Sequence, residues 1–130
     1  PVFYVQYAHA RIASLKRKAA DAGVDVTAPA DLHLLDEEEL ALVKLAGQYP
    51  RVVEGAAVAH EPHRIAFYLY DLAAAFHALW NRGNDDPGRR FLLEDRPELS
   101  RARLELASAV QQIIRNGLNL MGVEAAEEMR

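Results

Sequence analysis

The chain has 130 residues, of which 51% are apolar, and its formal net charge is −4. This length suits one domain with a hydrophobic core. No apolar run approaches the roughly 18 residues that a membrane-spanning helix needs. The absence of cysteine excludes disulfides and thiol catalysis. The negative charge argues mildly against a nucleic-acid partner, whereas the skew to 12 arginines against 3 lysines favours one, although the codon preference of a GC-rich genome would give the same skew.

The first predicted element is a helix over residues 2–22, which Gly23 is expected to end. Its apolar residues recur at helical spacing and should face the core: Val5, Ile12 and Leu15. The basic run Lys16-Arg17-Lys18 falls in the last turns, where positive charge suits the helix dipole.

Residues 24–35 show no clear period and are expected to be irregular. Asp36 then offers an N-cap, and Glu39 stands three residues later as its capping-box partner. This second helix should end near Gln48, because Pro50 follows. Its predicted apolar side consists of Leu40, Val43 and Leu45.

A short third helix is predicted over residues 51–60, and Pro62 fits the first turn of a fourth helix that runs to about Arg82. The fourth helix has a regular buried stripe: Ile65, Leu69, Leu72, Phe76 and Leu79. Residues 83–96 contain Gly, Asn, Asp and Pro and are expected to form a loop.

The last long helix should begin between Pro97 and Ser100 and end near Met121, where Gly122 stops it. Its predicted inner stripe is Leu99, Leu106, Val110, Ile113, Gly117 and Leu120. A short acidic tail follows. Since the sequence has no strand-like alternation and no repeat, it predicts one all-α domain over residues 1–130, a bundle of about five helices.

Three side chains in the first helix could contact RNA. Tyr4, Tyr7 and Arg11 are three and four positions apart and so share one helix face. Two aromatic rings and a guanidinium suit flat bases and nearby phosphate, but tyrosines on a helix face also commonly pack with only the hydroxyl at the rim. His9 lies on another face and is expected to be packed in the bundle with its ring nitrogens bonded.

The segment "HEPHR" at residues 60–64 contains two histidines and a glutamate, His60, Glu61 and His63, which could suggest a metal site. The zinc-protease motif needs histidines four positions apart on one helix, and proline interrupts this segment. A helix start is the preferred interpretation. No serine stands in a turn motif typical of a catalytic nucleophile, and the sequence has no glycine-rich phosphate-binding loop. No catalytic or metal-binding residue is therefore predicted.

Three blocks of the sequence resemble the C-terminal domain of arginyl-tRNA synthetases. They are "FYVQYAHARI", "EPHRIAFYLYDLAAAFHALWN" and "RARLELASAVQQIIRNGLNLMGVEAAEEM", they follow the family's order, and they cover nearly the whole chain. The resemblance implies a DALR-type anticodon-binding domain with an all-α fold. Where the family name spells Asp-Ala-Leu-Arg, this chain has Ser108-Ala109-Val110-Gln111, a departure expected to alter a structural polar contact more than recognition.

The resemblance also assigns roles to individual residues. In the family, the positions that match Tyr4, Tyr7 and Arg11 contact the anticodon loop, and the terminal methionine, here Met129, closes over the anticodon pocket. A polarizable thioether suits packing against a base. The candidate phosphate contacts are Lys16, Arg17, Lys18 and Arg64, although Arg64 could instead hold a neighbouring helix end.

The family's catalytic segments, His-x-Gly-His and Lys-Met-Ser-Lys, are absent. We therefore expect a class I catalytic domain upstream in a longer protein, which would use ATP and magnesium, and no cofactor or catalysis in this piece. The expected partner is arginine tRNA, through its anticodon stem-loop, and the protein is expected to be monomeric and cytoplasmic.

Three alternatives remain open. Composition and charge alone fit a helical protein-interaction module. The same domain type occurs in cysteinyl-tRNA synthetase and the glycyl enzyme's β-subunit, although the block "YVQYAHAR" argues against both. The third alternative is a small metalloenzyme built on His60 and His63.

Overall fold

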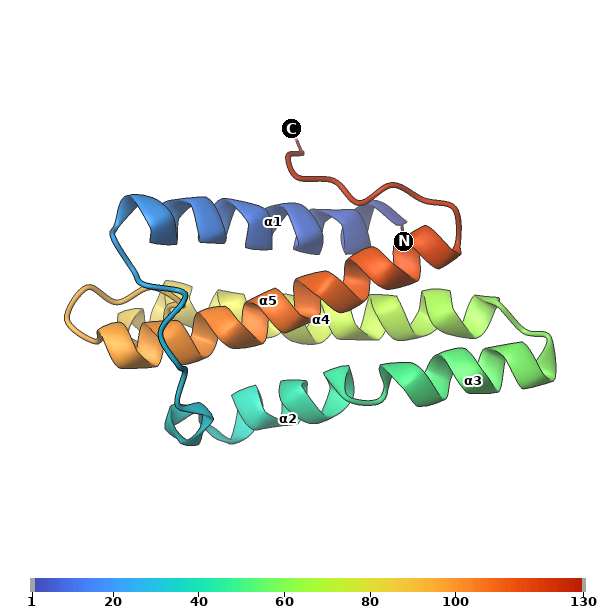
Figure 1. Ribbon diagram of the computed structural model, residues 1–130, viewed down its shortest axis with the longest axis horizontal. Helices are drawn as coiled ribbons and strands as arrows, with labels where there is room; N and C mark the ends of the chain where they lie inside the picture. The colour runs from blue at the N-terminus through green and yellow to red at the C-terminus, as the bar shows by residue number, and fades with distance from the viewer. Residues whose placement is uncertain (1, 130) are drawn as a thin grey trace.

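Five α-helices form the bundle in the computed structural model, which describes residues 2–129 (Figure 1). They are α1 (Val2–Asp21), α2 (Glu37–Ala46), α3 (Tyr49–Ala59), α4 (His63–Asp85) and α5 (Pro97–Leu120), with short 3₁₀ turns at Leu32–Leu34 and Pro87–Arg89. This confirms the predicted all-α class. Within the described residues, none of the helices is both long and apolar enough to cross a lipid bilayer.

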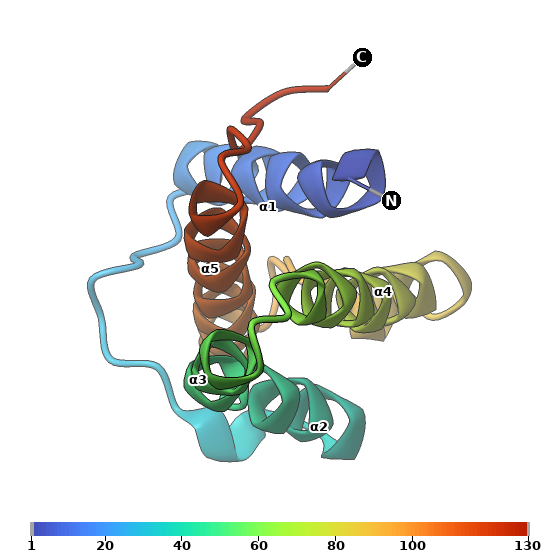
Figure 2. The same cartoon turned by 90° about the vertical axis from the view of Figure 1, so that its right-hand side faces the viewer.

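The helices pack in three levels. The long helices α4 and α5 contact each other in the middle, α1 lies across one side of this pair, and α2 and α3 follow one another along the opposite side (Figures 1 and 2). Large side chains from all three levels meet between them, and the largest fully buried apolar ones are Phe76, Ile12, Leu42, Leu69, Leu72, Ile114 and Leu118. The segment after α5 runs back along the outer side of α1.

The predicted helix boundaries follow local signals. The Asp36 carboxylate accepts from the Glu39 backbone amide at 2.9 Å, and the Glu39 carboxylate accepts from the Asp36 amide at 3.0 Å. This is the capping box that the sequence predicted for α2. Gly23 and Gly122 follow α1 and α5 with φ of +76° and +74°, a region that glycine adopts readily.

The buried stripe of α4 is confirmed, since all five of its predicted members are buried. The prediction for α2 is wrong at Leu40, which is 41% exposed while Leu42 is buried in its place. The predicted Val43 and Leu45 do pack half-buried against the core. In α5 the last stripe residue is also wrong: Leu120 is exposed, and Leu118 and Ile114 are buried instead. Because α5 contacts α1, α2 and α4, it buries a broad face, and a narrow stripe does not describe it.

A buried ion pair joins α2 to α5. The Arg103 Nε lies 2.8 Å from Glu39 Oε2, and both side chains are at most 5% exposed. The same guanidinium donates through Nη1 to the backbone carbonyls of Gly88 and Arg90 at 2.9 and 2.7 Å. One arginine of α5 therefore fixes α2 and the loop after α4.

Candidate functional site

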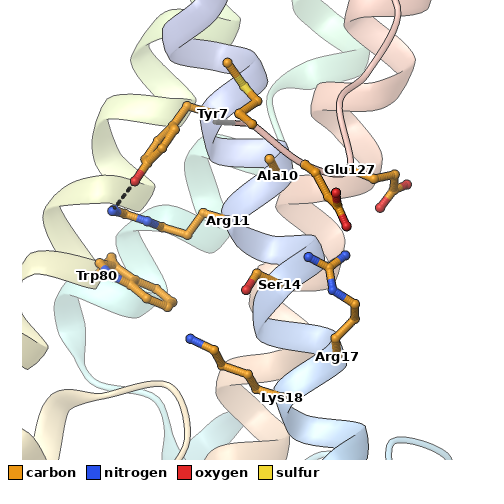
Figure 3. Close-up of a pocket in the computed structure, with 10 residues that line it drawn as sticks. Tyr7, Ala10, Arg11, Ser14, Arg17, Lys18, Trp80 and Glu127 are labelled. Carbon is orange, nitrogen blue, oxygen red and sulfur yellow. Dashed lines mark hydrogen bonds between the residues drawn. The ribbon is translucent and has the colours of Figure 1, made fainter.

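One flank of α1 borders a surface groove (Figure 3). Its side chains recur three or four positions apart, so they form a row on one helix face. Across the groove stand Trp80 of α4 and the tail, by which we mean residues 122–129. The groove has a volume of about 450 Å³ and is lined by Tyr7, Ala10, Arg11, Ser14, Arg17, Lys18, Trp80, Glu127, Glu128 and Met129.

The guanidinium of Arg11 is held between two aromatic rings. Its central carbon lies 4.8 Å from the Tyr7 ring centroid and 4.9 Å from the Trp80 centroid, distances at which a cation and a ring attract. Its Nη2 also donates to the Tyr7 hydroxyl at 2.9 Å, the dashed line in Figure 3. Arg11, Tyr7 and Trp80 therefore form a preorganised wall of the groove.

Behind this wall, His77 of α4 fixes Arg11 from the interior. The Nη1 of Arg11 donates to His77 Nδ1 at 3.1 Å, which requires that Nδ1 carries no proton. Burial is the main cause that lowers the pKa of His77, and the charge of Arg11 lowers it further. The imidazole is therefore neutral at pH 7, which is the form that can accept from arginine.

Tyr4 has a different place from Tyr7. Its ring packs against Tyr70 and His77, with centroid distances of 5.0 and 4.8 Å, and it does not line the groove. Tyr7 is 43% exposed at the groove. The two tyrosines share a helix face, as predicted, but only Tyr7 presents its ring to the groove, and Tyr4 supports His77.

The tail crosses α1 and brings Met129 to the groove. Gln6 Nε2 donates to the Glu124 carbonyl at 3.0 Å, and His9 Nδ1 lies 2.6 Å from the Ala126 carbonyl. His9 is fully buried, as the sequence predicted. Met129 and Tyr7, from the two ends of the described chain, thus line one groove.

The charges on the groove are mixed. Arg11, Arg17 and Lys18 contribute three cations, and Glu127 and Glu128 contribute two carboxylates. The groove is thus locally slightly cationic, although the chain as a whole carries a net charge of −4. The exposed ring of Tyr7 and the half-buried ring of Trp80 stand beside arginine and lysine, an arrangement that suits a flat, anionic ligand.

Lys16 and Arg64 lie away from the groove. The ammonium of Lys16 donates to Gln111 Oε1 at 2.6 Å, and burial, followed by the charge of Arg115, lowers its pKa. Arg64 pairs with Glu61 at 2.8 Å at the start of α4. The structure therefore brings together Tyr7, Arg11, Arg17, Lys18 and Met129 from the predicted set, but not Tyr4, Lys16 or Arg64.

Of the two histidines in "HEPHR", His60 is the C-cap of α3, with a φ of +55°, and His63 is the first residue of α4. Pro62 is the N-cap of α4, and the Glu61 carboxylate interacts with Arg64 and, at 3.5 Å, with His63 Nε2. The hydrogen bond from Arg64 is the main cause that lowers the pKa of Glu61. Among residues 2–129, no group of three or more His, Cys, Asp or Glu side chains could hold a metal ion.

The segment 108–111, which stands where the resembled family has Asp-Ala-Leu-Arg, lies inside α5. Gln111 is 4% exposed, donates through Nε2 to the His9 carbonyl at 3.2 Å and accepts from Lys16. It connects α5 to α1 and does not line the groove. This is the structural location that the sequence predicted for the departure from the family pattern.

Sequence reasoning gave no role to Trp80 and His77. His77 directly follows the buried stripe residue Phe76, Trp80 directly follows Leu79, and both contact Arg11 of α1. Trp80 is the only tryptophan of the sequence and stands at the edge of an apolar stripe, which could have indicated a functional role. That role became clear only from the packing of α4 against α1.

A family model described as the DALR anticodon binding domain matches residues 5–129. The chain is 58% identical over 129 residues to the arginine–tRNA ligase of Novosphingobium aromaticivorans, covering 99% of this chain and 22% of that protein. It is 56% identical over 138 aligned residues to the arginine–tRNA ligase of Rhodospirillum rubrum, covering all of this chain and 23% of that protein.

A solved structure is also similar. It is a Campylobacter jejuni protein described as an arginyl-tRNA synthetase, and its TM-score to this chain is 0.83 at 31% sequence identity. The match covers 99% of this chain and 26% of that one. The chain therefore spans about a quarter or less of the length of the proteins it matches.

Proposed function

The chain belongs to the DALR anticodon binding domain family, and on this premise we propose that it is the anticodon-binding domain of an arginine–tRNA ligase. The family match and the high identity to arginine–tRNA ligases support this proposal over the cysteinyl and glycyl enzymes. The observation that carries it is the groove, in which Tyr7, Arg11, Trp80 and Met129 stand together.

In this proposal the groove receives one unstacked base of the anticodon loop. Single-stranded RNA is recognised by splaying bases out, stacking them on aromatic rings or guanidinium planes, and bonding their edges. The exposed ring of Tyr7 offers a stacking surface, and Arg11, which is fixed by His77 and lies between the rings of Tyr7 and Trp80, stands beside it. Met129 packs against the base from the tail.

The base that such a domain must sense follows from the genetic code. Every arginine codon has guanine at its middle position, so arginine tRNAs share a middle anticodon cytosine. Backbone groups of the tail, which lie beside Tyr7, would bond the cytosine edge, and Arg17 and Lys18 would neutralise nearby phosphates. Lys16 and Arg64 would not contact the base in the groove, because Lys16 is bonded to Gln111 and Arg64 to Glu61. They could contact only parts of the tRNA that lie outside the groove.

Aminoacylation itself is assigned to the rest of a longer protein. The sequence lacks the two class I segments, and ATP and magnesium are therefore assigned to the catalytic domain in this proposal. The partners are then arginine tRNA and a class I catalytic domain, and the protein acts as a monomer in the cytoplasm.

A titration of the chain with an arginine anticodon stem-loop tests the proposal. We expect tighter binding than to the same RNA with the middle cytosine replaced by guanine. Tyr7→Ala should weaken binding roughly 5- to 150-fold, because a base stacked on an aromatic ring contributes about 1–3 kcal/mol.

The matched control is Phe67→Ala, which removes an aromatic ring that is 66% exposed on α4 and lies outside the groove. This variant should bind like the parent chain. Equal affinity for the two RNAs, or a Tyr7→Ala variant that binds normally, would contradict the proposal.

A further inference from the structure

The path of the tail is fixed by contacts from two helices. Gly122 turns the chain after α5, and Val123 and Ala125 pack against the hydrophobic core. The described residues after Ala125 form no helix, so the position of the tail depends on its contacts with side chains of α1 and α5. The strongest of these contacts is made by His9, which is fully buried beneath the tail.

His9 connects the tail to α5 through both ring nitrogens. Nδ1 lies 2.6 Å from the Ala126 carbonyl oxygen, so it must donate. Nε2 is then the acceptor, and Arg115 Nε lies 3.3 Å from it. A single neutral tautomer therefore satisfies both contacts at once.

The surroundings of His9 favour this neutral tautomer. Burial is the main cause that lowers its pKa, and the nearby charges of Arg115 and Lys16 lower it further. The Ala126 carbonyl and the Glu127 carboxylate act in the opposite direction. Since the net shift is downward, the ring keeps one free lone pair for Arg115 at neutral pH.

Arg115 makes a second contact with the tail. Its Nη2 donates to Glu127 Oε1 at 2.9 Å, while its Nε faces His9. One guanidinium thus holds both the ring that anchors residue 126 and the side chain of residue 127. Neither His9 nor Arg115 lines the groove, whereas Glu127 and Met129 do.

We propose that His9 and Arg115 are positioning residues for the groove: they form a clamp that fixes the tail across α1 and so sets where Met129 meets a bound base. This inference rests on the proposed function. Without the clamp the tail must be ordered by the RNA when it binds, and ordering a flexible side chain weakens binding by roughly two- to tenfold.

The test uses the whole chain and two measurements. Heteronuclear NOEs of the backbone amides of residues 124–129, recorded without RNA, report fast motion of the tail. Fluorescence anisotropy with the arginine anticodon stem-loop gives the affinity. Arg115→Met keeps the aliphatic stem of a half-exposed side chain and should raise tail motion and weaken binding roughly two- to tenfold.

Substitutions of His9 separate its two contacts. His9→Phe keeps the ring and loses both hydrogen bonds, so it should free the tail. His9→Asn places an amide donor near the position of Nδ1 and should retain part of the tail order and of the affinity. The control is Arg89→Met, since Arg89 is 44% exposed and paired with an acidic side chain, as Arg115 is, but lies in the turn after α4.

The outcomes distinguish the two proposals. If the tail stays rigid in both Arg115→Met and His9→Phe, the clamp is wrong. If the tail becomes mobile and the affinity is unchanged, the positioning role is wrong. If the parent chain binds no RNA, the proposed function and the positioning role both fail, and the NOEs alone decide whether the clamp exists. Should His9→Phe not fold, Arg115→Met decides each case.

Discussion

At Gly117 a single methyl group has no room. A Cβ placed there would lie 2.7 and 2.8 Å from the two Cδ atoms of Leu69, which is fully buried in α4. Because Leu69 is enclosed, it cannot move aside cheaply. Gly117→Ala should destabilise the chain by about 1–2 kcal/mol, since overpacking costs about 1–3 kcal/mol and the better helix propensity of alanine recovers at most about 1 kcal/mol.

Urea denaturation measures this difference, and Gly55→Ala is the matched control. A Cβ at Gly55 in α3 meets no atom within 4 Å. That variant should gain up to about 1 kcal/mol from helix propensity alone. If both alanines stabilise the chain equally, the close approach of α5 to Leu69 is not the reason for glycine at position 117.

The direction in which each side chain of the site points could not be predicted from the spacing of the residues in the sequence. Lys16, Arg17 and Lys18 are neighbours in sequence, but a helix turns about 100° per residue, so they point to different surroundings. Lys16 reaches Gln111 on α5, whereas Arg17 and Lys18 line the groove. A run of charges identifies a basic stretch and leaves open which member faces a ligand.

Among the elements, α2 depends most on one polar contact. Arg103→Met leaves the Glu39 carboxylate buried without its closest cation, and only Arg82, at 3.8 Å, remains near it. Breaking a buried pair in this way typically costs about 3–5 kcal/mol, and we expect about 3 kcal/mol because Arg82 compensates in part. Chemical denaturation monitored by circular dichroism measures the loss.

The double variant Arg103→Met with Glu39→Gln is the control. It removes the isolated charge while a side-chain oxygen remains for the Asp36 amide. It should be more stable than Arg103→Met alone. A double variant that is less stable than the single one would show that the carboxylate is tolerated without Arg103.

The elements themselves were largely predictable because their signals are local. The capping box at Asp36 and the glycines after α1 and α5 depend on a few neighbouring residues and lie where the sequence indicated. The buried faces of α2 and α5 were predicted less well. Glu39 faces the core because Arg103 meets it there, and α5 is buried by three partners at once; both facts depend on residues far apart in the sequence.

For the whole molecule, acid should reduce stability near neutral pH. The pKa values of His9 and His77 are both lowered, mainly by burial, from the usual 6.5. The unfolded chain therefore binds more protons than the folded chain as the pH falls below about 6.5. The contribution of the two neutral imidazoles to stability is fully present well above this value and is lost progressively as the pH falls below it.

Thermal unfolding at pH 8.0, 7.0, 6.0 and 5.5, a series chosen to span that range, measures the effect as a falling Tm. In His9→Asn one of the two buried imidazoles is gone, so the fall should be smaller than in the parent chain. A Tm that stays constant over the whole series would contradict the neutral, buried state of both rings.

RNA affinity should depend on salt only moderately, because the molecule is acidic overall and its cations are local. If Arg17 and Lys18 each neutralise one phosphate, log K should fall against log salt with a slope of about −1.4, since a single-strand contact contributes about −0.7. Arg17→Gln should make the slope shallower by about 0.7, and Arg64→Gln should leave it unchanged. Binding that salt does not weaken would exclude phosphate contacts.

The joining of both chain ends in one groove has a consequence for biosynthesis. His9 and Ala126 are 117 positions apart, which a ribosome adding about 5–20 residues per second covers in roughly 6–23 seconds. During that interval α1 can pack against α4, which is synthesised before α5, but the side of α1 that faces α5 stays uncovered. The groove is therefore completed only after α4, α5 and the tail have all been synthesised.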